Sequence, residues 1–286
     1  MKALTRNWDP VRHLKHKLAR PYSKLKDGFR FLTIYSRYDN KIYHDLICVL
    51  SGKNPVGELH THGNEARFRG LRFSFPERGT QLGEIINEVF VHRIYEGFGA
   101  TISKGDVVLD CGANIGLFTL YAQQKIGSTG IIISIEPIVE TYRLLTKNAL
   151  ENARPHQFIP LNLALSDKVE TRAFVYSEER NGSATGCVKR FEVAKGSTDS
   201  YKKLLVPCTS IDEIALNDLK TRIDFIKMDV EGMEKEVICG ATKTIRLFKP
   251  KLAISSHFDP QEIVKSLKQI NADYKITSSN DIIYAW

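Results

Sequence analysis

The stretch VVLDCGANIG, residues 107–116, decides the fold of this 286-residue chain. It begins as a short apolar strand at residues 107–110, continues through a turn that contains Gly112, and opens a helix near Asn114. A glycine at position 112 would let the backbone approach a ligand, and Gly116 would let the helix pack close to the strand. Ligands in open α/β sheets bind beyond the carboxyl ends of the strands, so we expect a binding site at this turn.

Downstream of residue 100, segments with strand composition alternate with segments of helical periodicity. Strands are predicted at residues 107–110, 131–136, 158–161, 224–228 and 251–255, and helices at residues 114–124, 141–152, 233–239 and 261–270. Residues 274–277 and 282–286 read as a final hairpin. This order predicts a doubly wound, mostly parallel α/β sheet with an antiparallel last strand.

The region before residue 100 has a different character. Residues 42–50 and 66–73 have strand-like composition, and the apolar spacing over residues 82–98 is helical. We therefore expect a basic arm at 1–30, an α+β extension at 31–100 and a ligand-binding domain at 101–286.

The charge of the chain is concentrated in its first thirty residues. The net charge is +8, and residues 1–30 hold nine basic side chains against two acidic ones, which leaves +1 for the rest. Such a basic segment could bind nucleic acid, anionic lipid or an acidic partner. The alternative is a solvated, partly helical arm, because aromatic residues do not alternate with the charges as in single-strand binders.

Composition excludes several classes of protein. The chain is 42% hydrophobic, with 19 glycines and 10 prolines, so collagen-like and low-complexity classes are excluded. It contains neither an apolar run of the roughly 18–20 residues that a membrane helix needs nor an apolar signal segment near Met1. Five cysteines without a CxxC pair favour a reducing, cytoplasmic environment. The sequence gives no indication of oligomeric state.

The residues around the turn indicate the kind of ligand. Glycine spacing at Gly112 and Gly116 departs from the dinucleotide pattern GxGxxG, and the sequence contains no P-loop. Asp110 at the first strand end suits a cation better than a pyrophosphate. Glu136 closes the second strand, where a carboxylate can accept both hydroxyls of a ribose. A ligand with a ribose, a positive charge and no phosphate fits S-adenosylmethionine.

Four motifs in a fixed order carry a family resemblance. They are DCGANIG at 110–116, EP at 136–137, NLALSD at 162–167 and IKMDVEGME at 226–234. Across roughly residues 85–260 the chain resembles the FkbM-type family of class I methyltransferases. The resemblance implies a seven-stranded Rossmann-like methyltransferase sheet, S-adenosylmethionine as donor with S-adenosylhomocysteine as product, and usually O-methylation of a sugar or polyketide-type hydroxyl.

The resemblance also implies roles for individual residues. The residues implied to bind the donor are Asp110, Gly112, Ala113, Asn114, Gly116, Glu136, Pro137, Asn162, Ala164 and Asp229. Among them, Glu136 would bind the ribose, Asn162 and Ala164 would lie near the adenine, and Asp229 would face the methyl-transfer site. Family members often carry a glutamate shortly before a histidine after the fifth strand; here the stretch is AISSH, which keeps only His257.

Transfer to a hydroxyl needs in-line positioning and a group that takes the proton. The candidates are Asp229, Glu231 and His257, and we expect His257 to act as the base while Asp229 orients acceptor or donor. Asp229 with Glu231 could instead hold a divalent metal, which we do not favour. His60 and His62 would share one face of a strand, but no third ligand is evident.

Three functions stay open at this point. The first is O-methylation of a small molecule, lipid or glycan. The second is methylation of RNA or protein, supported by residues 1–30. The third is a catalytically silent module that binds S-adenosylmethionine and serves an interaction.

Overall fold

The computed structural model describes residues 59–76, 82–152, 157–177, 184–187, 201–256 and 259–286. The chain divides into two units, residues 1–54 and 55–286, and all described residues belong to the second. The predicted basic arm at 1–30, the predicted strand at 42–50 and His257 lie outside the described residues. In the part of the chain that the structure describes, no helix combines the length and apolarity needed to cross a membrane.

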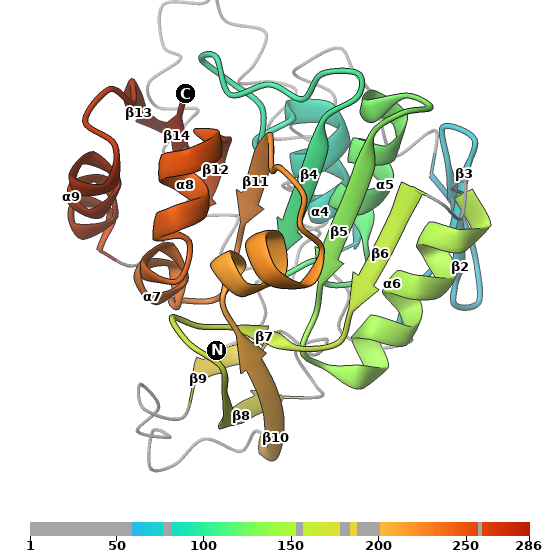
Figure 1. The fold of residues 1–286 in the computed structure, drawn as a ribbon. Coiled ribbons are helices and arrows are strands. Elements are labelled where there is room, and N and C mark those ends of the chain that lie inside the picture. The colour runs from blue at the N-terminus through green and yellow to red at the C-terminus, as the bar shows by residue number, and fades with distance from the viewer. Residues whose placement is uncertain (1–58, 77–81, 153–156, 178–183, 188–200, 257–258) are drawn as a thin grey trace, which may run out of the picture. The chain divides into compact units, whose positions relative to one another are not determined.

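A seven-stranded sheet forms the centre of this unit (Figure 1). Its order is β13-β14-β12-β11-β4-β5-β6, and the five strands from β12 to β6 are parallel. Strand β14 is antiparallel to both β12 and β13, which confirms the predicted fold class. The strands are β4 (Val107–Cys111), β5 (Ile131–Ile135), β6 (Phe158–Leu161), β11 (Phe225–Met228), β12 (Lys251–Ser255), β13 (Ile276–Ser279) and β14 (Ile282–Ala285).

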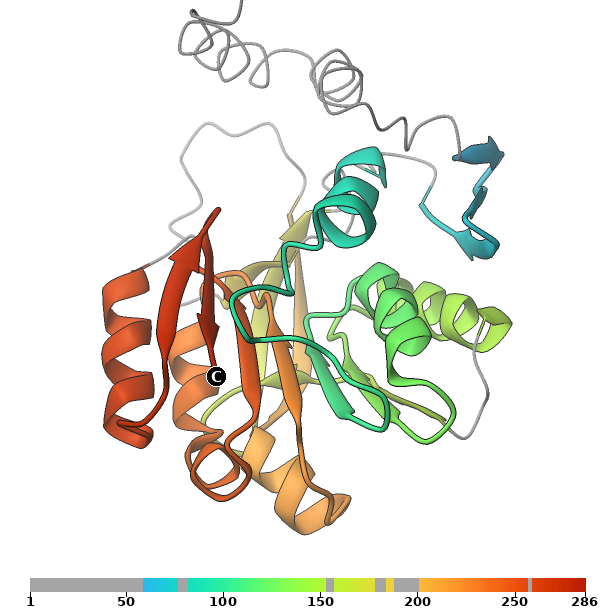
Figure 2. The same ribbon diagram turned by 90° about the horizontal axis from the view of Figure 1, so that it is seen from above.

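The central strands are buried on both faces, which explains their continuous apolar runs. All five residues of β4 are buried, and successive side chains point to opposite faces: Val108 joins one apolar cluster and Leu109 the other. Helices α5 (Leu117–Ile126) and α6 (Val139–Asn152) cover one face of the sheet. Helices α7 (Glu234–Cys239), α8 (Thr242–Phe248) and α9 (Pro260–Ile270) cover the other (Figure 2).

Two predicted helices have different limits in the structure. Helix α5 begins at Leu117 rather than at Asn114, because the turn continues through Gly116, whose φ is +90°. The helix predicted over residues 82–98 is α4 (Leu82–Ile86) followed by the π-helix η3 (Asn87–His92). It ends there because Arg93 adopts a left-handed conformation, and the remaining residues form turns.

A four-stranded sheet lies at the carboxyl ends of the parallel strands (Figure 1). Its order is β7-β10-β8-β9, with β7 (Ala164–Leu165), β8 (Glu170–Ser177), β9 (Ala184–Cys187) and β10 (Tyr201–Thr209). A small apolar cluster of Ala164, Phe174, Val206 and Cys208 holds β7, β8 and β10 together. A second π-helix, η6 (Glu213–Asp218), follows β10.

A three-stranded antiparallel sheet precedes α4. It consists of β1 (His60–His62), β2 (Glu65–Phe68) and β3 (Leu71–Ser74). The strand-like composition of residues 66–73 corresponds to two strands: Arg69 and Gly70, both with positive φ, turn the chain into a hairpin between β2 and β3. His60 and His62 do lie on one strand, and both are exposed.

Two asparagines of α6 cover the free edge of β3. The Asn148 amide donates to Ser74 O at 2.9 Å and accepts from Ser74 N at 2.6 Å. One helical turn later, the Asn152 amide makes the same pair of bonds with Arg72, at 2.6 and 3.0 Å. Asn148 also donates to Ile115 O at 2.8 Å, so it connects the hairpin sheet to the turn after β4.

Candidate active site

A cavity opens beyond the carboxyl ends of β4, β5 and β11, where the sequence places a ligand. Its walls come from the turn after β4, the ends of β5 and β11, strand β7 of the four-stranded sheet, and α4 with η3. The lining residues used below are Glu88, Tyr95, Gly112, Ala113, Asn114, Glu136, Pro137, Leu163, Ala164, Leu165, Phe174, Lys227, Asp229 and Glu231. Of the predicted donor-binding residues, Asp110, Gly116 and Asn162 are not part of this wall.

Gly112 is required by the contact between two loops. Its φ is +75°, and a Cβ at this position would lie 1.9 Å from Asp229 O. The turn after β4 therefore packs directly on the segment that follows β11. The N–H groups of Gly112 and Ala113 both donate to Ile135 O, at 3.1 and 2.9 Å, which also fastens the turn to β5.

Gly116 serves packing between helices. A Cβ here would lie 2.8 Å from Leu145 Cδ1, so the missing side chain lets the start of α5 approach α6. The sequence predicts contact with the strand instead. A glycine at this position indicates that close packing is needed but not which neighbour packs there.

Glu136 is the carboxylate that the cavity wall presents at the end of β5. It is 5% exposed; Oε2 accepts from Asn114 N at 2.9 Å and Oε1 accepts from Ile138 N at 3.0 Å. Burial raises the pKa of this carboxyl to about 7, against the two backbone hydrogen bonds, which favour the ionised form. The side chain thus ties β5 to the turn after β4, and its charge depends on pH near neutrality.

Asp110 lies beneath the wall, fully buried. Its Oδ2 accepts from Thr119 Oγ1 at 2.7 Å, and its Oδ1 lies 3.3 Å from Lys227 Nζ. The cation that Asp110 binds is therefore a lysine of the chain itself. The sequence predicts contact with the donor; in the structure Asp110 does not line the cavity, and its carboxylate forms a buried ion pair.

Lys227 occupies a buried position of β11 and reaches the cavity wall. Its Nζ donates to Gly112 O at 2.7 Å and lies 5.3 Å from the centre of the Tyr95 ring. Burial opposes the charge on this lysine, but attraction by Asp110 and Asp229 outweighs it, so the pKa is raised. The ammonium therefore stays charged, compensated by two carboxylates.

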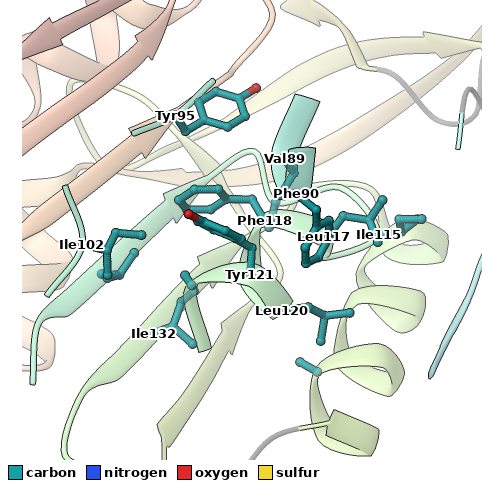
Figure 3. Packing of buried hydrophobic residues seen from close by; sticks show 14 of the residues in the cluster. Val89, Phe90, Tyr95, Ile102, Ile115, Leu117, Phe118, Leu120, Tyr121 and Ile132 are labelled. Carbon is teal, nitrogen blue, oxygen red and sulfur yellow. The ribbon is translucent and has the colours of Figure 1, made fainter. Parts of the chain in front are cut away.

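Asp229 follows β11 and lines the cavity. The Tyr95 hydroxyl donates to Asp229 Oδ2 at 2.9 Å. Figure 3 shows this hydroxyl pointing away from the apolar cluster to which the Tyr95 ring belongs, with Phe118 beside it. Burial first, and then the charge of Asp229, raises the pKa of Tyr95 far above its usual value, so the phenol stays protonated.

Tyr95 was missed by sequence reasoning. A single tyrosine after a helix carries no motif, and its partner lies 134 residues further along the chain. The only available signal was its place at the end of the helical pattern that the structure packs against the turn after β4.

The turn after β11 carries Glu231 and Glu234. Glu231 lines the cavity with a positive φ of 52°. Glu234 is buried, and its Oε1 accepts from Val230 N at 3.3 Å and Gly232 N at 3.1 Å. Glu234 thus shapes the loop that presents Asp229 and Glu231.

The remaining predicted residues divide between the wall and its support. Pro137 and Ala164 line the cavity, and Leu163, Leu165 and Phe174 give that side an apolar surface. Asn162 supports the wall instead: its Nδ2 donates to Glu136 O at 2.9 Å and to Pro137 O at 3.2 Å.

No carboxylate trio forms around Asp229 within the part of the chain that the structure describes. The described group whose ligand atoms lie within 4.8 Å of one another is Asp167, Glu170 and Glu236. Arg172 forms ion pairs with all three, so an arginine occupies the place that a metal ion would take. Among the described residues, no third His, Cys, Asp or Glu side chain joins Asp229 and Glu231 in such a group.

The sheet order and the cavity at the ends of β4, β5 and β11 define a Rossmann-like methyltransferase fold. The methyltransferase FkbM domain matches residues 110–276, and the chain belongs to this family. A solved structure of the methyltransferase FkbM from Methylobacillus flagellatus KT superposes with a TM-score of 0.50 at 19% identity, over 70% of this chain and 47% of that one. This likeness supports the fold alone.

Curated relatives are similar at lower coverage. The AMB antimetabolite synthetase AmbE of Pseudomonas aeruginosa is 26% identical over 57% of this chain, which spans only 9% of that protein. The hexuronic acid methyltransferase AglP of Haloferax volcanii is 27% identical over 62% of this chain and 67% of its own length. The 31-O-demethyl-FK506 methyltransferase FkbM of Streptomyces tacrolimicus is 23% identical, over 68% of this chain and 76% of its own.

Proposed function

We propose that this chain is an S-adenosylmethionine-dependent methyltransferase that methylates a hydroxyl of a sugar, glycan, lipid or natural product. The observation that carries the proposal is the buried Glu136 carboxylate on the cavity wall, hydrogen-bonded to the glycine-containing turn after β4. A carboxylate at this place can accept hydrogen bonds from ribose hydroxyls.

The lining residues fit the donor in a second respect. Leu163, Ala164, Leu165 and Phe174 provide an apolar surface beside Glu136, as an adenine ring requires. Glu136 would hold the ribose, and Gly112 to Asn114 would contact the methionine part. The donor, when bound, supplies an electrophilic methyl group. Asp110 contributes indirectly, through Lys227 and Gly112.

Asp229 is the residue that we place closest to the reaction. Its carboxylate lies on the wall, with one oxygen held by Tyr95, so the side chain can orient an acceptor hydroxyl or take its proton. Glu231 lines the same wall and is a second carboxylate for this purpose. His257 stays our prediction for the base.

Support for a sugar or natural-product acceptor comes from two relatives. One is named a hexuronic acid methyltransferase and the other a 31-O-demethyl-FK506 methyltransferase. The chain spans 67% and 76% of their lengths, and both identities are below 30%. The acceptor of this chain therefore has to be identified by experiment.

The test is incubation with methyl-labelled S-adenosylmethionine and fractionated cell extract. Label in a small-molecule, lipid or glycan fraction, lost in the Asp229→Asn variant, is the expected result. Label in RNA or protein would replace our acceptor class with the alternative that residues 1–30 suggested. Donor binding without transfer in any fraction would identify a silent binding module.

A further inference from the structure

The burial of the charged Lys227 side chain costs free energy. The other residues of β11 are Phe225, Ile226 and Met228, all fully buried, and Lys227 is 4% exposed in the middle of them. Moving an ammonium group out of water costs several kcal/mol, and a well-packed apolar residue paired with an apolar partner is often at least as stable. Stability alone therefore does not explain a lysine at this position.

The contacts of Lys227 divide into two kinds. Asp110 Oδ1, at 3.3 Å, neutralises the charge from within the core. The shorter contact, 2.7 Å to Gly112 O, reaches the turn that lines the cavity. The first contact neutralises the charge of the lysine, whereas the second restrains the turn that lines the cavity.

The turn at Gly112 is held from three directions. The N–H of Gly112 donates to Ile135 O, its missing Cβ faces Asp229 O, and its carbonyl accepts from Lys227. The peptide between Gly112 and Ala113 is held on its N–H side, because Ala113 N donates to Ile135 O at 2.9 Å. The Lys227 hydrogen bond holds the carbonyl side of the same peptide, so the peptide is restrained at both ends.

We propose that Lys227 is a positioning residue for donor binding. Its ammonium group fixes the Gly112 carbonyl, while Asp110 neutralises the charge of Lys227. This inference rests on the proposed function, because it names what shapes the turn that contacts the donor. Lys227 therefore affects the affinity for the donor through Gly112, in addition to forming an ion pair with Asp110. Removing lysine and aspartate together therefore separates the two effects.

The experiment measures two quantities, the Tm and the calorimetric Kd for S-adenosylhomocysteine. Lys227→Met leaves Asp110 buried without its cation, so the Tm falls by about 10 °C and the Kd rises about tenfold or more. Lys227→Met combined with Asp110→Asn removes both charges and regains most of the lost Tm. The expected result is that the Kd of this double variant stays raised.

Lys251 offers a matched control. Its Nζ donates to Thr101 O at 2.8 Å and lies 3.8 Å from Asp106 Oδ2, the same pair of contacts outside the cavity. Lys251→Met is expected to leave the Kd unchanged.

The possible outcomes are distinct. A double variant that regains both Tm and wild-type Kd would overturn the proposal, because Lys227 would then serve its ion pair alone. A Lys227→Met variant with wild-type Kd would overturn it as well. A wild-type protein that does not bind S-adenosylhomocysteine would contradict the proposed function itself, which is a different failure.

Discussion

The backbone N–H of Asn114 lies 2.9 Å from Oε2 of Glu136, so the carboxylate at the end of one strand is bonded to the turn that follows its neighbour. Burial raises the pKa of this carboxyl to about 7. The turn after β4 and the acidic end of β5, both singled out in the sequence, are thus joined by a hydrogen bond. The charge of the Glu136 carboxyl changes near neutral pH.

Donor binding is expected to depend on pH through Glu136. Ribose hydroxyls donate to the ionised carboxylate, so affinity for S-adenosylhomocysteine rises about tenfold from about pH 6 to about pH 8 and then levels off. Calorimetry across this range measures the effect. Glu136→Gln should bind weakly with a flat profile, and a wild-type profile without slope would contradict the assignment.

The contribution of Glu136 to folding stability should change with pH in the opposite direction to donor affinity. Because the folded pKa lies above the ordinary value of 4.5, the folded protein keeps a proton that the unfolded chain has lost between about pH 4.5 and 7. The contribution of Glu136 to stability is therefore present below this window and declines as pH rises through it. Denaturant titrations of wild type and Glu136→Gln should diverge in this window, whereas parallel curves would count against the raised pKa.

Gly112→Ala should damage both fold and binding. The substitution combines a positive φ with a Cβ placed 1.9 Å from Asp229 O, and we expect a loss of about 3 kcal/mol in the free energy of unfolding. Gly70→Ala is the control, because Gly70 has a φ of +80° and a Cβ added there would meet nothing within 4 Å. That variant should lose about 1 kcal/mol. Equal losses would mean that the loop contact is unimportant.

Asn148→Ala tests the link between the three-stranded sheet β1-β2-β3 and the candidate active site. It removes three buried hydrogen bonds, to both backbone groups of Ser74 and to Ile115 O, and should cost about 3 kcal/mol. Asn152→Ala removes the corresponding bonds to Arg72 at an exposed position, where water replaces them, and should cost about 1 kcal/mol or less. Chemical denaturation compares the two, and a larger loss at Asn152 would reverse our interpretation.

Asp229→Asn should slow methyl transfer about a hundredfold. S-adenosylhomocysteine binding should change much less, because we assign Asp229 chiefly to the acceptor. Tyr95→Phe should show a smaller loss of the same kind, since it removes only the hydrogen bond to Asp229. Tyr121→Phe is the control, because this buried tyrosine donates to Glu96 away from the cavity. A Tyr121 loss as large as that of Tyr95 would indicate a general packing effect.

The sequence predicted the fold and the position of the site because both depend on local order. Apolar strands alternating with periodic helices specify the sheet, and strand ends specify its ligand edge, so Glu136 and Asp229 were predicted at the edge where the structure has the cavity. Asp110 was predicted to contact the positively charged donor; the structure shows it in an ion pair with Lys227, a residue 117 positions further along the chain. Tyr95 is distant from its partner in the same way, and no residue pattern reveals such pairs.

Composition left one detail open. Residues 66–73 have strand-like composition, and Arg69 and Gly70 form a turn that divides them between two strands. The glycine was the available signal, and the apolar residues on both sides obscured it.

The most direct test of the account is calorimetric titration of the chain with S-adenosylhomocysteine, repeated with Glu136→Ala. We predict one site per chain in the wild type, and affinity at least about tenfold weaker in the variant. Absence of binding at concentrations up to about 1 mM, or equal binding by both proteins, would contradict the claim that this cavity holds the methyl donor through Glu136.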